Sequence, residues 1–73
     1  MRKLDLHGKS YEDAKLSSCI FIENNIDDLP IQIITGNSVE MKKIVLEIVK
    51  THELKAYPKT HYNLGCLIIN NNY

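Results

Sequence analysis

The chain has 73 residues, of which 44% are hydrophobic and 25% are charged, and its nine basic and nine acidic side chains give a formal net charge of zero. This length predicts one domain with a small core, because folding at this size buries only about 60% of the surface of the extended chain. The balanced composition excludes a disordered chain. A net charge of zero excludes nucleic-acid binding by bulk charge, so any such binding has to use local patches.

The two cysteines, Cys19 and Cys66, have no CxxC or cysteine–histidine spacing around them. We therefore expect no zinc site and treat both thiols as small buried hydrophobic groups. No secretory signal precedes the first predicted strand, and no apolar run approaches the ~20 residues of a membrane span. These features predict a cytoplasmic protein without a membrane partner.

Polar and apolar residues alternate near the start of the chain, over residues 2–7. This alternation has the period of a half-buried strand, in which successive side chains point to opposite faces. Gly8 ends the predicted strand. Its apolar side is expected to hold Leu4 and Leu6, and its polar side Lys3, Asp5 and His7.

A helix is predicted to begin at about Tyr11, because Ser10 and Asp13 have the spacing of a capping box with aspartate in place of glutamate. Leu16 and Ile20 lie four residues apart on the otherwise acidic face of this helix, where the core does not explain them. They are scattered surface residues, residues packed under the C-terminal tail, or a contact for a dimer or another protein. The expected inward stripe is Tyr11, Ala14, Ser18, Phe21 and Ile22.

The middle of the chain repeats the order of strand and helix. Residues 31–34 form an apolar run after Pro30 and predict a central strand, which ends at residues 35–36. Ser38 is a suitable N-cap for a second helix over residues 39–51. The inward face of that helix is expected to be Met41, Ile44, Val45, Ile48 and Val49.

The last part of the chain predicts two short extended segments. Residues 57–59 are turn or edge-strand material, because proline has no N–H for a strand ladder, and residues 66–69 form the final strand. The resulting order, β-α-β-α-β-β, defines an α/β fold, a two-layer α/β sandwich made by one domain over residues 1–73. Ligand sites in such sheets lie beyond the carboxyl ends of the strands, here residues 7–8 and 35–36.

Asp5 and His7 are the first candidates for chemistry. Because they are two residues apart on one strand, both side chains project from the same face. A carboxylate near an imidazole favours the charged form of the ring and orients it, as a general acid or base at neutral pH requires. The alternative is an ordinary polar strand face.

Residues 35–38 add a candidate phosphate site. A glycine turn that runs into a helix start presents backbone N–H groups to an anion, and a phosphate there would also compensate Lys42 and Lys43, whose charges oppose the helix dipole. Gly65 would let a phosphate backbone come close to the last strand. Simple turns and a serine cap explain the same residues. The predicted phosphate-binding residues are Gly8, Thr35, Gly36, Asn37, Ser38, Lys42, Lys43, Asn63 and Gly65.

Taken together, these segments resemble the Smr (small MutS-related) domain family over nearly the whole chain. Residues 4–8 read Leu-Asp-Leu-His-Gly and match the opening motif of the family in full, and residues 35–36 match the start of its second motif. Residues 37–38 stand in place of the second glycine region. Gly65 alone stands for the glycine-rich third motif.

The resemblance implies a fold similar to the C-terminal domain of bacterial translation initiation factor three, and a nicking or endonuclease activity on DNA or RNA. It carries Asp5 and His7 over as the catalytic residues. RNA would be cleaved through its 2′-OH without a metal, whereas DNA would need an activated water. The sequence requires no cofactor, and Mg²⁺ at the phosphates is an open alternative.

Two other functions stay open at this point. One is a nucleic-acid-binding module that keeps the Smr surface but has no turnover. The other is a protein-interaction domain that uses Leu16 and Ile20. The expected partner is RNA or DNA, and the expected assembly is a monomer or a weak homodimer.

Overall fold

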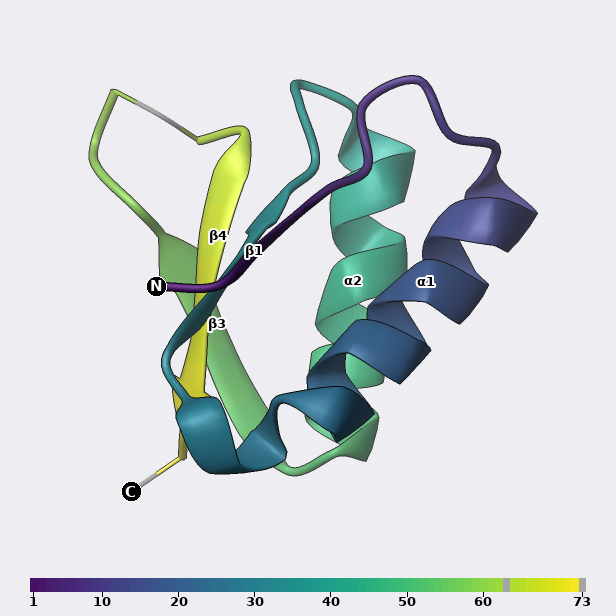
Figure 1. Ribbon diagram of the computed structural model, residues 1–73. Coiled ribbons are helices and arrows are strands. Elements are labelled where there is room, and N and C mark those ends of the chain that lie inside the picture. Colours follow the sequence, from purple (N-terminus) through teal and green to yellow (C-terminus); the bar gives the residue numbers. More distant parts are fainter. Residues whose placement is uncertain (63, 73) are drawn as a thin grey trace.

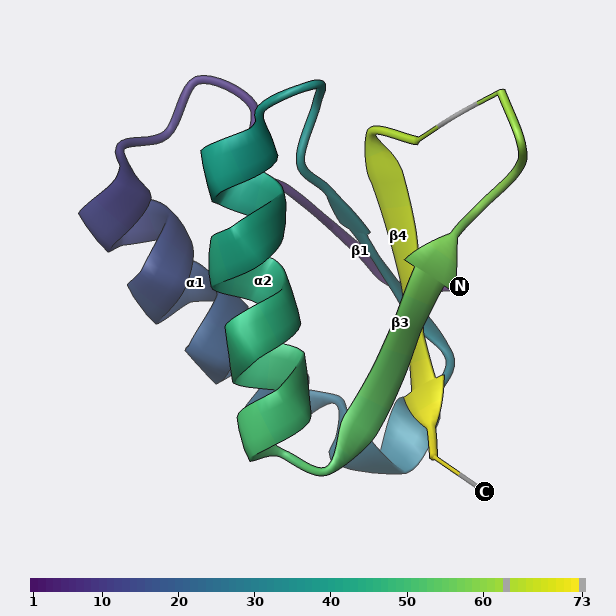
Figure 2. The same ribbon diagram turned by 180° about the vertical axis from the view of Figure 1, so that it is seen from behind.

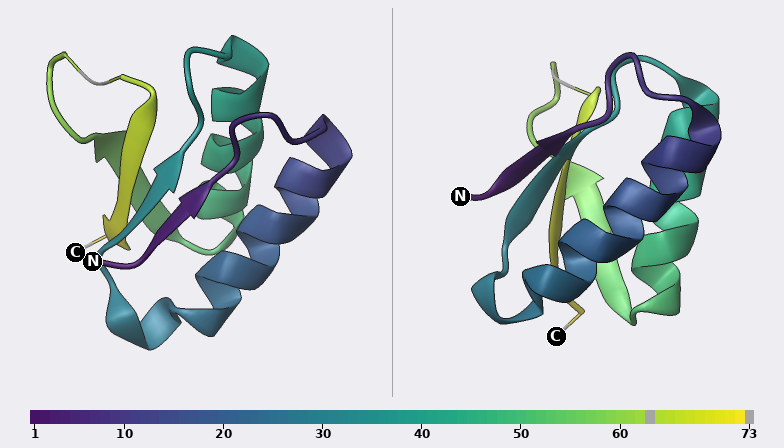
Figure 3. Two further views of the ribbon diagram at one scale, coloured as in Figure 1. Left: turned by 45° about the horizontal axis from the view of Figure 1, so that its top comes forward. Right: turned by 45° about the vertical axis from the view of Figure 1, so that its right-hand side comes forward.

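The computed structural model describes residues 1–62 and 64–72, and within these residues two α-helices cover one face of a four-stranded sheet (Figures 1 and 3). The predicted two-layer α/β sandwich is therefore confirmed. The elements in chain order are β1 (Lys3–Asp5), α1 (Tyr11–Asn24), a 3-10 helix η1 (Ile26–Asp28), β2 (Ile31–Ile34), α2 (Val39–Thr51), β3 (Leu54–Pro58) and β4 (Cys66–Asn71).

The strand order brings three chain segments to the same end of the sheet, where β1 and β2 finish and β4 begins. The order is β1-β2-β4-β3, with β1 parallel to β2 and β4 antiparallel to both of its neighbours. Asp5 pairs with Ile34, and Ile34 pairs with Cys66. The carboxyl ends of β1 and β2 and the first residue of β4 consequently lie at the same end of the sheet, in the upper part of Figure 1, where both helices also begin.

The core lies between the sheet and the helices, and both helices begin at the predicted capping serines. The Ser10 hydroxyl accepts the N–H of Asp13 over 3.2 Å, and the Ser38 hydroxyl accepts the N–H of Met41 over 3.1 Å. These bonds satisfy N–H groups that have no partner inside a helix. The buried apolar cluster consists of Leu6, Ala14, Ile22, Ile31, Ile33, Met41, Val45, Ile48, Val49, Leu67 and Ile69.

Helix α1 departs from its prediction at its first residue. Tyr11, expected in the inward stripe, is 54% exposed, because it lies at the open end of the helix and the buried stripe starts only at Ala14. Ser18 is fully buried as predicted, but its hydroxyl has no hydrogen-bond partner among the described residues. Leu16 and Ile20 are exposed, so the expectation that they pack under the C-terminal tail is wrong.

The two extended segments after α2 are longer than predicted. The edge-strand alternative is confirmed: β3 forms the edge strand beside α2 (Figure 2) and pairs with β4, which continues to Asn71. Pro58 ends β3 at the sheet edge, where a residue without an N–H is tolerated. Cys66 is buried, Cys19 is half-buried, and both thiols are free. In the described part of the chain, neither helix is long and apolar enough to cross a membrane.

Candidate active site

His7 lies at the corner of a tight turn directly after β1. The turn is closed by a 3.0 Å hydrogen bond from the Lys9 N–H to the Leu6 carbonyl, and Gly8 has a φ of 82°. A positive φ at the third residue is what a type II turn requires, and glycine adopts it without strain. Leu6 is fully buried while His7 is exposed. The turn therefore holds the imidazole at the surface.

The Asp5 carboxylate acts on the backbone of His7. Asp5 Oδ1 accepts the His7 N–H over 2.9 Å, and both residues are exposed as predicted. The predicted strand over residues 2–7 is too long, because β1 ends at Asp5 and His7 lies in the turn that follows. The sequence led us to expect that Asp5 orients the imidazole. In the structure the hydrogen bond fixes the main chain of His7 instead, and the ring has no hydrogen-bond partner among the described residues.

The imidazole of His7 lies beside the turn between β2 and α2. Gly36 has a φ of 67°, and its ideal Cβ position is 3.9 Å from His7 Cδ2. The parallel pairing of β1 with β2 produces this contact, because each strand runs into its turn at the same edge. Two of the segments singled out from the sequence thus meet in space.

Gly65 lies on the other side of this turn, and its carbonyl accepts the backbone N–H groups of the turn. The Gly65 carbonyl accepts the N–H of Thr35 (2.7 Å) and of Gly36 (3.1 Å), and the Thr35 hydroxyl lies 3.2 Å away. These N–H groups therefore do not face an anion, which corrects the role expected for them. The Thr35 side chain is also buried, with 3% exposed.

Gly65 itself is a packing residue. A Cβ at this position would lie 2.9 Å from the Gly36 carbonyl oxygen, so the close approach that Gly65 permits is that of the Gly36 backbone. Gly8 differs, because apart from its two chain neighbours no described residue comes within 4 Å of a Cβ placed there. A ligand can therefore approach Gly8 directly. Asn63, also predicted to bind phosphate, lies outside the described residues.

Predicted phosphate-binding groups that are not used within the fold lie at the start of α2. Asn37 is exposed and Ser38 is half-buried, and the first N–H groups of the helix have no acceptor within it. Lys43 Nζ lies 3.8 Å from Glu40 Oε1, so this lysine is compensated within its own helix. Lys42 forms no ion pair in the described part of the chain, and it is the cation that remains for a ligand.

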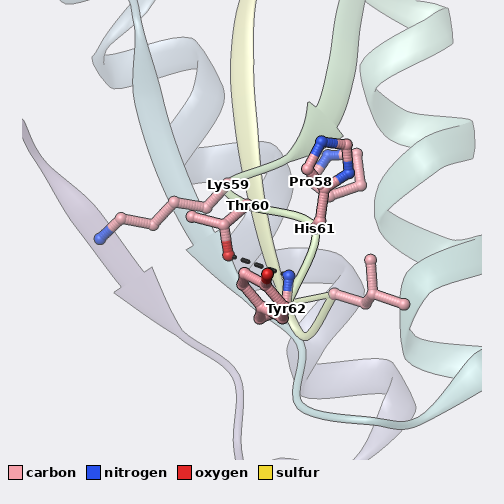
Figure 4. Close-up of a pocket in the computed structure, with 6 residues that line it drawn as sticks. Pro58, Lys59, Thr60, His61 and Tyr62 are labelled. Atoms are coloured by element: carbon pink, nitrogen blue, oxygen red, sulfur yellow. Dashed lines mark hydrogen bonds between the residues drawn. The ribbon is translucent and has the colours of Figure 1, made fainter.

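A hollow of about 550 Å³ lies in the loop between β3 and β4, and sequence reasoning did not predict it. Figure 4 shows the loop, with Lys59 extending away from His61 and Tyr62. The lining residues are Pro58, Lys59, Thr60, His61, Tyr62 and Leu64.

Metal ligands are sparse near His7. Among residues 1–62 and 64–72, no three histidine, cysteine, aspartate or glutamate side chains are grouped to hold a metal ion. Asp5 contributes a carboxylate, and one of its oxygens already accepts the His7 N–H. These residues do not form a magnesium site by themselves, and a magnesium ion here would depend on substrate phosphates for most of its ligands.

Comparison of the chain with protein-family models, curated proteins and solved structures gave no match.

Proposed function

We propose that this domain is a nucleic-acid endonuclease of the Smr type, in which His7 transfers the proton. The observation that carries the proposal is the position of the exposed imidazole, 3.9 Å from the ideal Cβ of Gly36, at the turn that starts α2. A phosphate at that helix start would lie next to a titratable base, which is the pairing that general acid–base cleavage needs. The resemblance of residues 4–8 and 35–36 to the Smr motifs supports the same reaction.

RNA is the substrate that a single histidine serves best. His7 accepts the proton of a 2′-OH, and the 2′ oxygen attacks the adjacent phosphorus. The bond from phosphorus to the 5′ oxygen then breaks, and the 5′ oxygen takes a proton from the imidazolium. The products are a 2′,3′-cyclic phosphate and a 5′-OH end, and no metal takes part. DNA has no 2′-OH, so its cleavage would need an activated water. Among the described residues, the site near His7 has only the Asp5 carboxylate to help activate that water.

Residues around His7 would hold the phosphate. Lys42 supplies a point charge that has no ion pair with any described residue, and Asn37 and Ser38 supply polar groups at the start of α2. Gly8, the next residue after His7, has open space at its ideal Cβ position among the described residues, so its backbone is accessible to a phosphate. Asp5 serves as a positioning residue, because its carboxylate fixes the backbone of His7.

A second candidate is a nucleic-acid-binding module without turnover. The observation in its favour is that the His7 ring has no acidic hydrogen-bond partner among the described residues, since Asp5 is bound to the main chain. Binding without cleavage would use the same phosphate groups.

The proposal includes the partner, the oligomeric state and the compartment of the protein. The partner is RNA or DNA, and the domain acts as a monomer or a weak homodimer. A reducing, cytoplasmic compartment is supported by the free thiols of Cys19 and Cys66.

The experiment is cleavage of end-labelled single-stranded RNA, and of DNA of the same sequence, with and without EDTA. We expect cleavage of RNA that EDTA does not stop and that leaves cyclic phosphate ends. Binding of RNA with no cleavage by wild-type protein would replace the endonuclease by the binding module.

A further inference from the structure

The face of the sheet opposite the helices carries basic and aromatic side chains. The row of Leu4, Ile33 and Leu67 packs into the core. Because side chains alternate along a strand, the neighbouring row points to the other face. That row runs across all four strands and consists of Lys3, Gln32, Ile68 and Tyr57, each paired with the next. Lys3 and Tyr57, on the two outer strands, are exposed, whereas Gln32 and Ile68 between them are buried.

The outer strand β3 adds two cations to this open face. Lys55, Tyr57 and Lys59 alternate along the chain, and the Lys59 N–H donates to the Cys66 carbonyl over 2.9 Å, which continues the ladder one residue beyond β3. All three side chains are therefore on the same face. Tyr57 is 41% exposed, and Lys55 Nζ lies 6.0 Å from the centre of its ring.

Acidic side chains are nearly absent from this face. Asp5 is the only aspartate or glutamate in the strands of the described chain. The sequence after Glu53 has two lysines and no carboxylate, so the first 53 residues hold the other seven basic and all nine acidic side chains. The zero net charge of the chain thus conceals a separation of charge, with the β3–β4 part positive.

We propose that the open face of the sheet binds single-stranded nucleic acid, with an unpaired base stacked on Tyr57 and phosphates beside Lys3, Lys55 and Lys59. This inference rests on the proposed function and names its substrate class. An exposed aromatic ring flanked by cations is the arrangement that stacks bases of a single strand, whereas a duplex hides the faces of its bases. Asp5 lies on this same face, so a strand bound there leads to the edge where His7 lies.

The test is fluorescence anisotropy with fluorescein-labelled oligouridine and with the corresponding oligouridine–oligoadenosine duplex. The protein carries His7→Ala, so that cleavage does not interfere. We expect the single strand to bind more tightly than the duplex. Tyr57→Ala should weaken binding about 10-fold, whereas Tyr57→Phe, which keeps the ring, should stay within about twofold.

The lysines are tested by the salt dependence of the same binding. Lys55→Gln and Lys59→Gln should each reduce the slope of log K against log salt by about 0.7, because each lysine releases about one counterion from a single strand. Lys50→Gln, on α2 and thus on the opposite side of the sheet, is the matched control and should leave the slope unchanged. Equal slopes for all three variants would overturn the inference.

NMR shift mapping covers the case in which Tyr57→Ala fails to fold. Addition of oligouridine to the His7→Ala protein should shift the amide signals of β3 and of Lys3 more than those of α1. Shifts confined to the helices would place the oligouridine on the helical layer and would contradict the inference. If wild-type protein cleaves RNA but Tyr57→Ala changes neither binding nor cleavage, the sheet-face inference alone fails. If binding depends on Tyr57 and no cleavage occurs, the endonuclease proposal alone fails.

Discussion

Gly65 packs directly on the backbone of Gly36, and its carbonyl accepts the Gly36 N–H over 3.1 Å. The contact joins the start of β4 to the turn after β2, and on its other side Gly36 faces His7. One glycine pair thus sets the distance between the imidazole and the C-terminal hairpin.

Gly65→Ala should destabilise the protein by about 1 to 3 kcal/mol, because a Cβ placed 2.9 Å from a backbone oxygen forces the main chain to move. Urea unfolding followed by circular dichroism measures the change. Gly8→Ala is the comparison: it has open space, and its cost is the left-handed backbone alone, about 1 to 2 kcal/mol. Gly65→Ala as stable as wild type would contradict the packing role.

Asp5→Asn and Asp5→Ala separate the two roles of the carboxylate. If Asp5 acts through its hydrogen bond to the His7 N–H, the amide oxygen of asparagine can replace it, and Asp5→Asn should keep most of the cleavage rate. Asp5→Ala removes the acceptor and should lower both the rate and the stability, the latter by about 0.5 to 1.5 kcal/mol. Equal loss of rate in both variants would show that the negative charge itself matters.

Ser18→Ala should stabilise the fold. The hydroxyl is fully buried in α1 and has no hydrogen-bond partner in residues 1–62 and 64–72, and alanine also has the higher helix propensity. We expect a gain of about 1 kcal/mol, which raises the melting temperature by about 4 to 8 °C in a domain of this size. Differential scanning calorimetry is the measurement, and an unchanged or lower melting temperature would be the contrary result.

Lys42→Gln should weaken RNA binding more than Lys43→Gln. Lys43 is paired with Glu40, whereas Lys42 has no ion pair in the described chain. Binding titrations at several salt concentrations should show a slope smaller by about 0.7 for Lys42→Gln and a smaller change for Lys43→Gln. Identical effects of the two substitutions would remove the distinction between them.

Local signals in the sequence predicted most of the fold. The alternation around Leu4 and the caps at Ser10 and Ser38 fixed the first strand and both helix starts, because each depends on neighbouring residues alone. Strand β3 was not predicted in full, since Leu54–Pro58 has a weak apolar pattern and is held by pairing with β4. Such pairing joins distant residues and leaves little trace in either segment.

Only part of the candidate site was predicted, because some of its contacts depend on the pairing of strands that are distant in the sequence. That His7 and Gly36 would meet followed from two parallel strands ending at one edge. The use of the Thr35 and Gly36 N–H groups by Gly65 could not be foreseen, because it depends on the register between β2 and β4. The row of Lys3, Gln32, Ile68 and Tyr57 was not predicted, because it is formed by four strands together.

The most direct test of the proposed function compares the rate of RNA cleavage by wild-type protein with that of His7→Ala, purified in parallel. Proton transfer by a positioned side chain contributes about 10²- to 10⁴-fold, so we expect a loss of that size. The melting temperature should stay unchanged, because His7 is exposed and buries little apolar area. Lys50→Gln, on α2, should cleave at the wild-type rate. Cleavage by His7→Ala at the wild-type rate, or its absence from both proteins, would contradict the account.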